Sequence, residues 1–211
     1  MRLLSRSVLL LTLPVCFFAS ADGVAAKKSL MAKLQNIHHF SAKFSQQVFD
    51  NDNKLIQQGS GTIVVSKPNK VHWQTLEPEE SLIVSDGTTL WLYDPFIEQA
   101  SAFSLAKSVV NTPILLLTNE SAEVWNKYQV NYQDSNSQNQ DVYEIQSIDE
   151  QSQVKSLVVS FQGEKIESLL IHDATGQKSE ITLTDNNYQA VPSSELFNFS
   201  VPEGVYLDDQ R

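Results

Sequence analysis

Hydrophobic residues change their spacing along this chain, from a helical period to every second position. Leu30, Leu34 and Ile37 recur at helical spacing with lysines between them, which predicts an amphipathic N-terminal helix. Beyond it, apolar and polar residues alternate in several stretches, namely 40–44, 71–75, 157–161 and 181–183. This alternation is typical of antiparallel strands with one buried face.

Turn residues separate these stretches. Asp86-Gly87 lies between apolar residues 82–84 and 90–93 and predicts a hairpin. Lys67-Pro68-Asn69 predicts a second turn, and residues 173–176 predict a third. Residues 133–140 are polar enough to form a long hairpin loop.

Residues 103–117 depart from the strand pattern, because they are mostly apolar and carry a single charge, Lys107. Thr112 is a candidate N-cap and Pro113 suits the first helical position, so a very apolar short helix should follow. We expect a mainly β fold, with a curved antiparallel sheet and a pair of apolar helices on its concave face. Composition leaves open whether these helices complete a core or act as a removable lid.

The first residues read as a cleaved export signal. Arg2 and Arg6 precede an apolar run over 8–18, and Ala19-Ser20-Ala21 offers the small residues that a signal peptidase reads. Cleavage after Ala21 leaves one domain over 22–211; a second candidate end is Ala26. The apolar run is too short to anchor the chain in a bilayer.

The one cysteine, Cys16, lies inside the signal. It could be read as a lipidation site, but Pro14 and Val15 fit badly where such sites need small residues. Without lipidation, the mature chain has no cysteine and is not membrane-anchored, and we expect a monomer without disulfides.

Charge excludes some partners. The chain carries a formal charge of -10, and loss of Arg2 and Arg6 leaves 13 basic against 25 acidic residues. Such a chain is unsuited to nucleic acid, which needs clustered basic residues, and to electrostatic docking on anionic lipid.

No catalytic constellation is recognisable. The sequence has no nucleophile elbow, no zinc-protease motif, no phosphate-binding glycine loop and no cysteine for a nucleophile in the mature chain. Acidic groups near Pro78 (Glu77, Glu79, Glu80) and at Asp208-Asp209 could do acid–base work, but their polar, turn-like contexts predict solvated side chains. We therefore expect no enzyme, no catalytic residue and no cofactor.

The histidines give no clear metal site. His38-His39 could be metal ligands, but more simply they would cap the end of the first helix. His72 and His172 lie on predicted strands, where a surface imidazole is expected. We predict no metal ligands.

Several short strings recur in one order over the whole mature region. They are Gln58-Gly59-Ser60-Gly61, Lys67-Pro68-Asn69 before Trp73, Pro78-Glu79-Glu80-Ser81, residues 84–93, residues 94–100, Asn111-Thr112-Pro113, residues 202–205 and residues 208–211. Each is weak alone, but their shared order and spacing are specific. By them the chain resembles the LolA family of periplasmic outer-membrane lipoprotein carriers.

The resemblance implies an incomplete antiparallel β-barrel with a helical lid over a hydrophobic cavity. It also implies a periplasmic chaperone in lipoprotein transport, which receives acylated lipoproteins from an inner-membrane ABC-type release complex and delivers them to an outer-membrane receptor. In the family a basic residue, usually arginine, holds the closed lid through lid backbone atoms. Lys67 stands at this position, a departure that predicts a weaker or differently aimed latch.

For the acyl-chain cavity we predict aromatic residues of the strands and apolar residues of the lid: Trp73, Trp91, Phe96, Leu105, Val109 and Leu116. A register error of one residue would invert the strand assignments. Two other functions stay open. One is an envelope lipid-binding or sensor module of the same fold, and the other is a periplasmic hydrolase, which the lack of a nucleophile–base pair disfavours.

Overall fold

A computed structural model describes residues 19–108, 112–133 and 139–211. Within these ranges the strands form one twelve-stranded sheet in the order β12-β6-β5-β4-β3-β2-β1-β11-β10-β9-β8-β7. The strands are β1 (His39–Phe49), β2 (Leu55–Ser66), β3 (Lys70–Glu77), β4 (Ser81–Asp86), β5 (Thr89–Asp94), β6 (Gln99–Ser104), β7 (Tyr128–Gln133), β8 (Gln140–Ser147), β9 (Val154–Gln162), β10 (Lys165–Asp173), β11 (Lys178–Asn187) and β12 (Tyr206–Gln210). The helices are α1 (Ala19–Asn36), α2 (Leu105–Ser108), α3 (Pro113–Thr118), α4 (Ala122–Trp125) and the 3-10 helix η2 (Ser194–Phe197).

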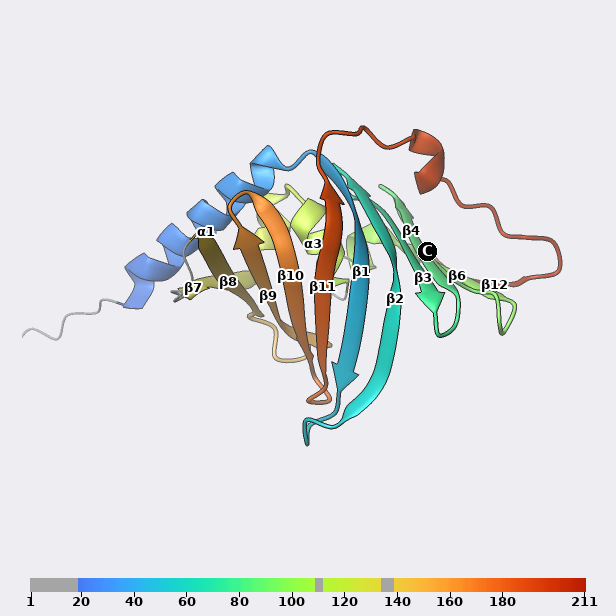
Figure 1. The fold of residues 1–211 in the computed structure, drawn as a ribbon, viewed down its shortest axis with the longest axis horizontal. Coiled ribbons are helices and arrows are strands. Elements are labelled where there is room, and N and C mark those ends of the chain that lie inside the picture. Colours follow the sequence, from blue (N-terminus) through green and yellow to red (C-terminus); the bar gives the residue numbers. More distant parts are fainter. Residues whose placement is uncertain (1–18, 109–111, 134–138) are drawn as a thin grey trace, which may run out of the picture.

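The sheet curves strongly but does not close, because β12 and β7 stand at opposite ends of the strand order. Neighbouring strands are antiparallel except β12, which pairs with β6 in parallel. Figure 1 shows α1 running across the β7–β8 end of the sheet, while α3 lies within the curve. This confirms the expected mainly β fold, an incomplete curved antiparallel sheet with helices on its inner face.

The core lies between the inner face and the helices. Side chains of α1 such as Leu30 and Leu34 are at most 4% exposed. They join inward residues of the strands, including Phe40, Val159 and Ile181, in one hydrophobic cluster. The alternating apolar positions seen in the sequence are therefore the inward positions of β1, β3, β9 and β11.

Two lysines fix α1 to the β7–β10 part of the sheet. Lys27 donates from Nζ to the carbonyl oxygens of Trp125 and Tyr128 at 2.5 and 3.2 Å. Lys33 donates to the carbonyl of Gly163 at 2.9 Å and forms an ion pair with Asp141 at 2.9 Å. Burial acts to lower the pKa of Lys33, but its bonds to acidic partners outweigh burial and raise it.

The helical segment after β6 is shorter than the sequence predicts. Phe103 belongs to β6, and α2 begins only at Leu105. Thr112 occupies the N-cap position of α3 as predicted, but its side chain makes no capping hydrogen bond. Of the described helices, none is long and apolar enough to cross a membrane.

The histidines differ from their predicted roles. His38 is exposed beyond the end of α1, and the C-terminal carbonyl of Leu34 is bound instead by the side chain of Lys67, at 2.6 Å. No group of three or more metal-binding side chains occurs within the described ranges.

The C-terminal segment crosses the outer face of the sheet, a feature that the sequence did not suggest. Phe197 of η2 is 2% exposed, and η2 packs against β3 and β4. Between them lies a pocket of about 270 Å³, whose lining residues include His72 of β3 and Glu195 of η2. Nδ1 of His72 is buried and has no hydrogen-bond partner among the described residues.

The buried imidazole of His72 should make the folded protein less stable in acid. Burial lowers the pKa of His72 below its ordinary 6.5, so the unfolded chain binds the proton more tightly. Stability should therefore fall as the pH drops through 6.5 towards the lowered folded value. Thermal unfolding from about pH 7.5 to about pH 5 should show a smaller decrease in midpoint for His72→Gln than for the unaltered protein. Equal decreases would contradict this account, and the solvated histidine variant His38→Gln is the control.

Candidate functional site

On the inner face, the short helix α3 makes an apolar contact with the sheet. Four consecutive residues of α3 are at most 5% exposed: Ile114, Leu115, Leu116 and Leu117. A helix that is buried on all sides is unusual for a surface element and requires an apolar surface around it. One void beneath α3, of about 10 Å³, is lined partly by Leu116, Ile145 and Leu157. An acyl chain can lie at this point only after α3 has moved.

Lys67 links the β2–β3 turn to two helical segments. Its side chain is 7% exposed, and Nζ donates to the carbonyl of Leu34 at the end of α1 and lies 3.8 Å from Glu120, just after α3. Burial lowers the pKa of Lys67, although Glu120 acts in the opposite direction. The ammonium group thus bridges the helix ends that meet at this turn. The resemblance implied a bond to lid backbone, whereas the backbone acceptor described here is in α1 and the contact with the segment after α3 is the Glu120 carboxylate.

Asn119, the residue after α3, forms a second connection to the same turn. Its Nδ2 donates to Oδ1 of Asn69 at 3.1 Å. Its carbonyl accepts a hydrogen bond from Nε1 of the buried Trp125 at 2.8 Å. The C-terminal end of α3 is therefore fastened both to the sheet and to α4.

Three of the predicted cavity residues lie together in the hydrophobic cluster: Trp73, Leu105 and Leu116. Trp73 is 9% exposed, and its ring centroid lies 4.6 Å from that of Phe44. Val109 falls outside the described residues.

Trp91 and Phe96 lie elsewhere. Trp91 pairs with Val84, which pairs with His72, so Trp91 is on the outer face of the sheet. There its ring centroid lies 5.3 Å from that of Phe199, in the C-terminal segment. Phe96 is 77% exposed in the β5–β6 turn. Neither residue faces the helices, so we leave both out of the cavity proposed below.

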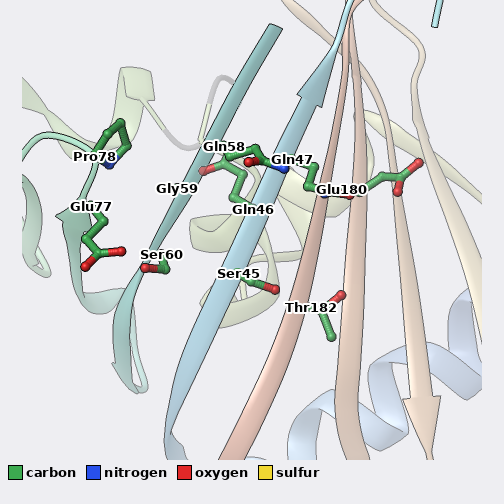
Figure 2. A pocket seen from close by; sticks show the side chains of 10 residues that line it. All are labelled: Ser45, Gln46, Gln47, Gln58, Gly59, Ser60, Glu77, Pro78, Glu180 and Thr182. Atoms are coloured by element: carbon green, nitrogen blue, oxygen red, sulfur yellow. The ribbon is translucent and has the colours of Figure 1, made fainter. Parts of the chain in front are cut away.

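A polar groove of about 690 Å³ lies on the outer face, where β1, β2 and β11 continue beyond the helices. Figure 2 shows its side chains, and the carboxylates of Glu77 and Glu180 are among them. Ser45 and Gln47 alternate with Phe44, whose side chain is buried in the core, so they point away from it. Apart from Pro78, its lining residues are polar or glycine, so the groove offers no large aliphatic or aromatic side chain to an acyl chain.

The fold and the site define a class of protein, an open β-sheet whose apolar inner face is closed off by short helices and can shield an apolar ligand. The family comparison is more specific. The family described as outer membrane lipoprotein carrier protein LolA matches residues 35–200, and the chain belongs to this family.

Proteins of similar sequence or fold match this chain over most of its length. An outer-membrane lipoprotein carrier protein of Aeromonas salmonicida is 39% identical over 88% of this chain and 90% of its own. One of Shewanella loihica is 39% identical over 99% and 96% of the two chains. An uncharacterized conserved protein of Thermus thermophilus has the same fold, with a TM-score of 0.54 at 6% identity over 87% of this chain and 98% of its own.

The family match and the two lipoprotein carriers from Aeromonas and Shewanella establish the general function. The protein is a periplasmic outer-membrane lipoprotein carrier, a chaperone and not an enzyme.

Proposed function

We propose that the protein, as a monomer, receives acylated lipoproteins from an ABC-type release complex of the inner membrane, holds their acyl chains between the sheet and the helices, and passes them to an outer-membrane receptor. The supporting observation is the run of four buried aliphatic residues in α3, Ile114 to Leu117, over an apolar sheet face. Trp73, Leu105 and Leu116 are the proposed acyl contacts, and Lys67 is the proposed latch.

The energies explain why a helix covers the site. Burying an acyl chain contributes about 0.8 kcal/mol per methylene, or roughly 12 kcal/mol for a chain of some sixteen carbons. A carrier with an empty, preformed cavity would gain all of this and release its cargo too slowly. In this protein the cargo must first displace the helices.

Displacing α3 exposes four large aliphatic side chains, which cost about 1.5–3 kcal/mol each, or about 6–12 kcal/mol together. This is similar to the gain from one acyl chain. The free energy gained by burying the acyl chain is then close to the free energy lost by displacing α3. A receptor with modestly higher affinity can therefore take the cargo.

The position of signal cleavage decides where the mature domain begins. We place signal cleavage after Ala21, because Ala26 is 6% exposed and belongs to the core cluster. Cleavage after Ala26 would remove this side chain and the first part of α1. The intact mass of the exported protein distinguishes the two, and a mature chain beginning at Lys27 would refute the assignment.

The experiment that tests the function mixes the purified protein with inner-membrane vesicles that carry labelled lipoprotein and ATP. We expect the label to leave the vesicles as a soluble one-to-one complex. Outer-membrane vesicles added next should take up the label. Label that stays in the inner-membrane vesicles would refute the carrier proposal and leave a lipid-binding or sensor role.

A further inference from the structure

One row of paired residues crosses the inner face from beneath the helices to the β12 edge of the sheet. Each residue is the direct partner of the next, so all of their side chains point to the same face. From β1 to β12 the row is Ala42, Ile63, Trp73, Ile83, Leu92, Ser101 and Asp208.

Exposure increases along the apolar part of this row. Ile63 is 0% exposed, Trp73 is 9% exposed and Leu92 is 37% exposed. Ile83, between Trp73 and Leu92, is half-buried and packs against the core. Since neighbouring strands lie about 4.8 Å apart, the strip from Ile63 to Leu92 is about 14 Å long. It thus leads from the covered core to a solvent-exposed position.

The surroundings of the strip become polar on two sides. After Leu92 the row continues with Ser101, whose Oγ accepts a hydrogen bond from Nε2 of Gln99 at 3.3 Å, and then with Asp208. The adjacent inward positions, on the side away from α2, are Thr75, Ser81 and Asp94. The uncovered apolar surface is therefore a narrow strip.

We propose that this strip is the path by which an acyl chain of the cargo reaches the interior, passing over Leu92 and Ile83 towards Trp73. The inference rests on the proposed function and specifies its route. The hydrocarbon lies on Leu92 and Ile83, and the ester end of the chain faces the polar positions at Ser101 and Asp208. An extended acyl chain has the same arrangement as the strip, because both are apolar along their length and polar at one end.

Leu207 offers a matched control. It is 40% exposed, close to the value for Leu92, and it also lies near the β12 edge. Leu207 pairs with Ala100, which pairs with Tyr93, so its side chain is on the outer face. It should not contact the cargo.

The test compares Leu92→Asp with Leu207→Asp in the vesicle release assay. Loading should be at least about tenfold slower for Leu92→Asp, since a carboxylate in the path must be desolvated, and unchanged for Leu207→Asp. Near-UV circular dichroism checks that both variants are folded. Equal loading by the two variants would overturn the inference.

A second measurement is independent of the stability of the aspartate variants. The chain from residue 22 has no cysteine, so Leu92→Cys and Leu207→Cys can each carry one polarity-sensitive fluorophore. Loading should shift the emission to shorter wavelength at position 92 only. No shift at 92 in a loaded complex overturns the path but not the carrier function, whereas failure of the unaltered protein to load refutes the function itself.

Discussion

Replacing Gly61 with alanine is expected to abolish the native fold. A Cβ atom at this position would lie 1.9 Å from the carbonyl oxygen of Gln74 and 2.9 Å from Cε1 of Phe44. The first contact is with backbone of the neighbouring strand, so a side-chain rotation cannot relieve it. The ring of Phe44 also packs on Trp73, so moving it would disturb the core beneath the helices. The loss should be at least about 4 kcal/mol, well above that of an ordinary substitution.

Gly59 is the matched control on the same strand. A Cβ atom there would lie 3.2 Å from the carbonyl oxygen of Glu77, a contact that a small shift relieves. Gly59→Ala should cost about 1 kcal/mol and remain folded. Thermal unfolding followed by circular dichroism compares the two, and similar stability of both variants would contradict the close packing at Gly61.

Lys67→Leu is expected to leave loading intact but to slow delivery about tenfold or more. The variant loses the ion pair with Glu120, just after α3, and the hydrogen bond to Leu34 that holds the ammonium group at the end of α1, and so it loses the link between the two helix ends. A hydrogen bond to a charged group contributes about 1.5–3 kcal/mol, and each 1.4 kcal/mol changes a population ratio tenfold. With closure less favourable, the loaded and open form persists.

Delivery is measured by mixing the loaded carrier with outer-membrane vesicles that contain the receptor. Lys67→Arg should deliver normally, because it keeps a donor at this position. Lys165→Leu removes an exposed lysine and serves as the control for the change in net charge. Undiminished delivery by Lys67→Leu would refute the latch.

Much of the fold could be predicted because the alternation of apolar and polar residues is a local signal that marks most of the strands. Strict alternation at Phe40, Trp73 and Val159 reflects strands with one face in the core, and the Asp86-Gly87 turn joins β4 to β5 as expected. The apolar α3 was also evident, since nothing but burial accounts for four consecutive aliphatic residues after Pro113.

The remaining features depend on contacts between distant parts of the chain. Trp91 was assigned to the cavity because aromatic residues on a strand do not reveal which face they occupy. Its environment is set by Phe199 of the C-terminal segment, more than 100 positions later. Similarly, the sequence suggested that histidines cap α1, whereas the cap is Lys67, 33 positions after its acceptor Leu34. Local pattern gives the elements, and only register and packing give the faces and partners.

The central claim is that α3 must leave the inner face before acyl chains can occupy it, and a reversible tether tests it directly. His38 and Glu120 both lie beside Lys67: the carbonyl of His38 accepts its backbone N–H at 2.8 Å, and the carboxylate of Glu120 lies near its Nζ. Both side chains are exposed, so cysteines at the two positions can be joined by a short, reducible bis-maleimide. Each single-cysteine variant, treated in the same way, is a control.

In the vesicle release assay the tethered carrier should take up no lipoprotein, and reduction of the tether should restore uptake to the level of the controls. Uptake by the tethered carrier at the rate of the controls would contradict the claim.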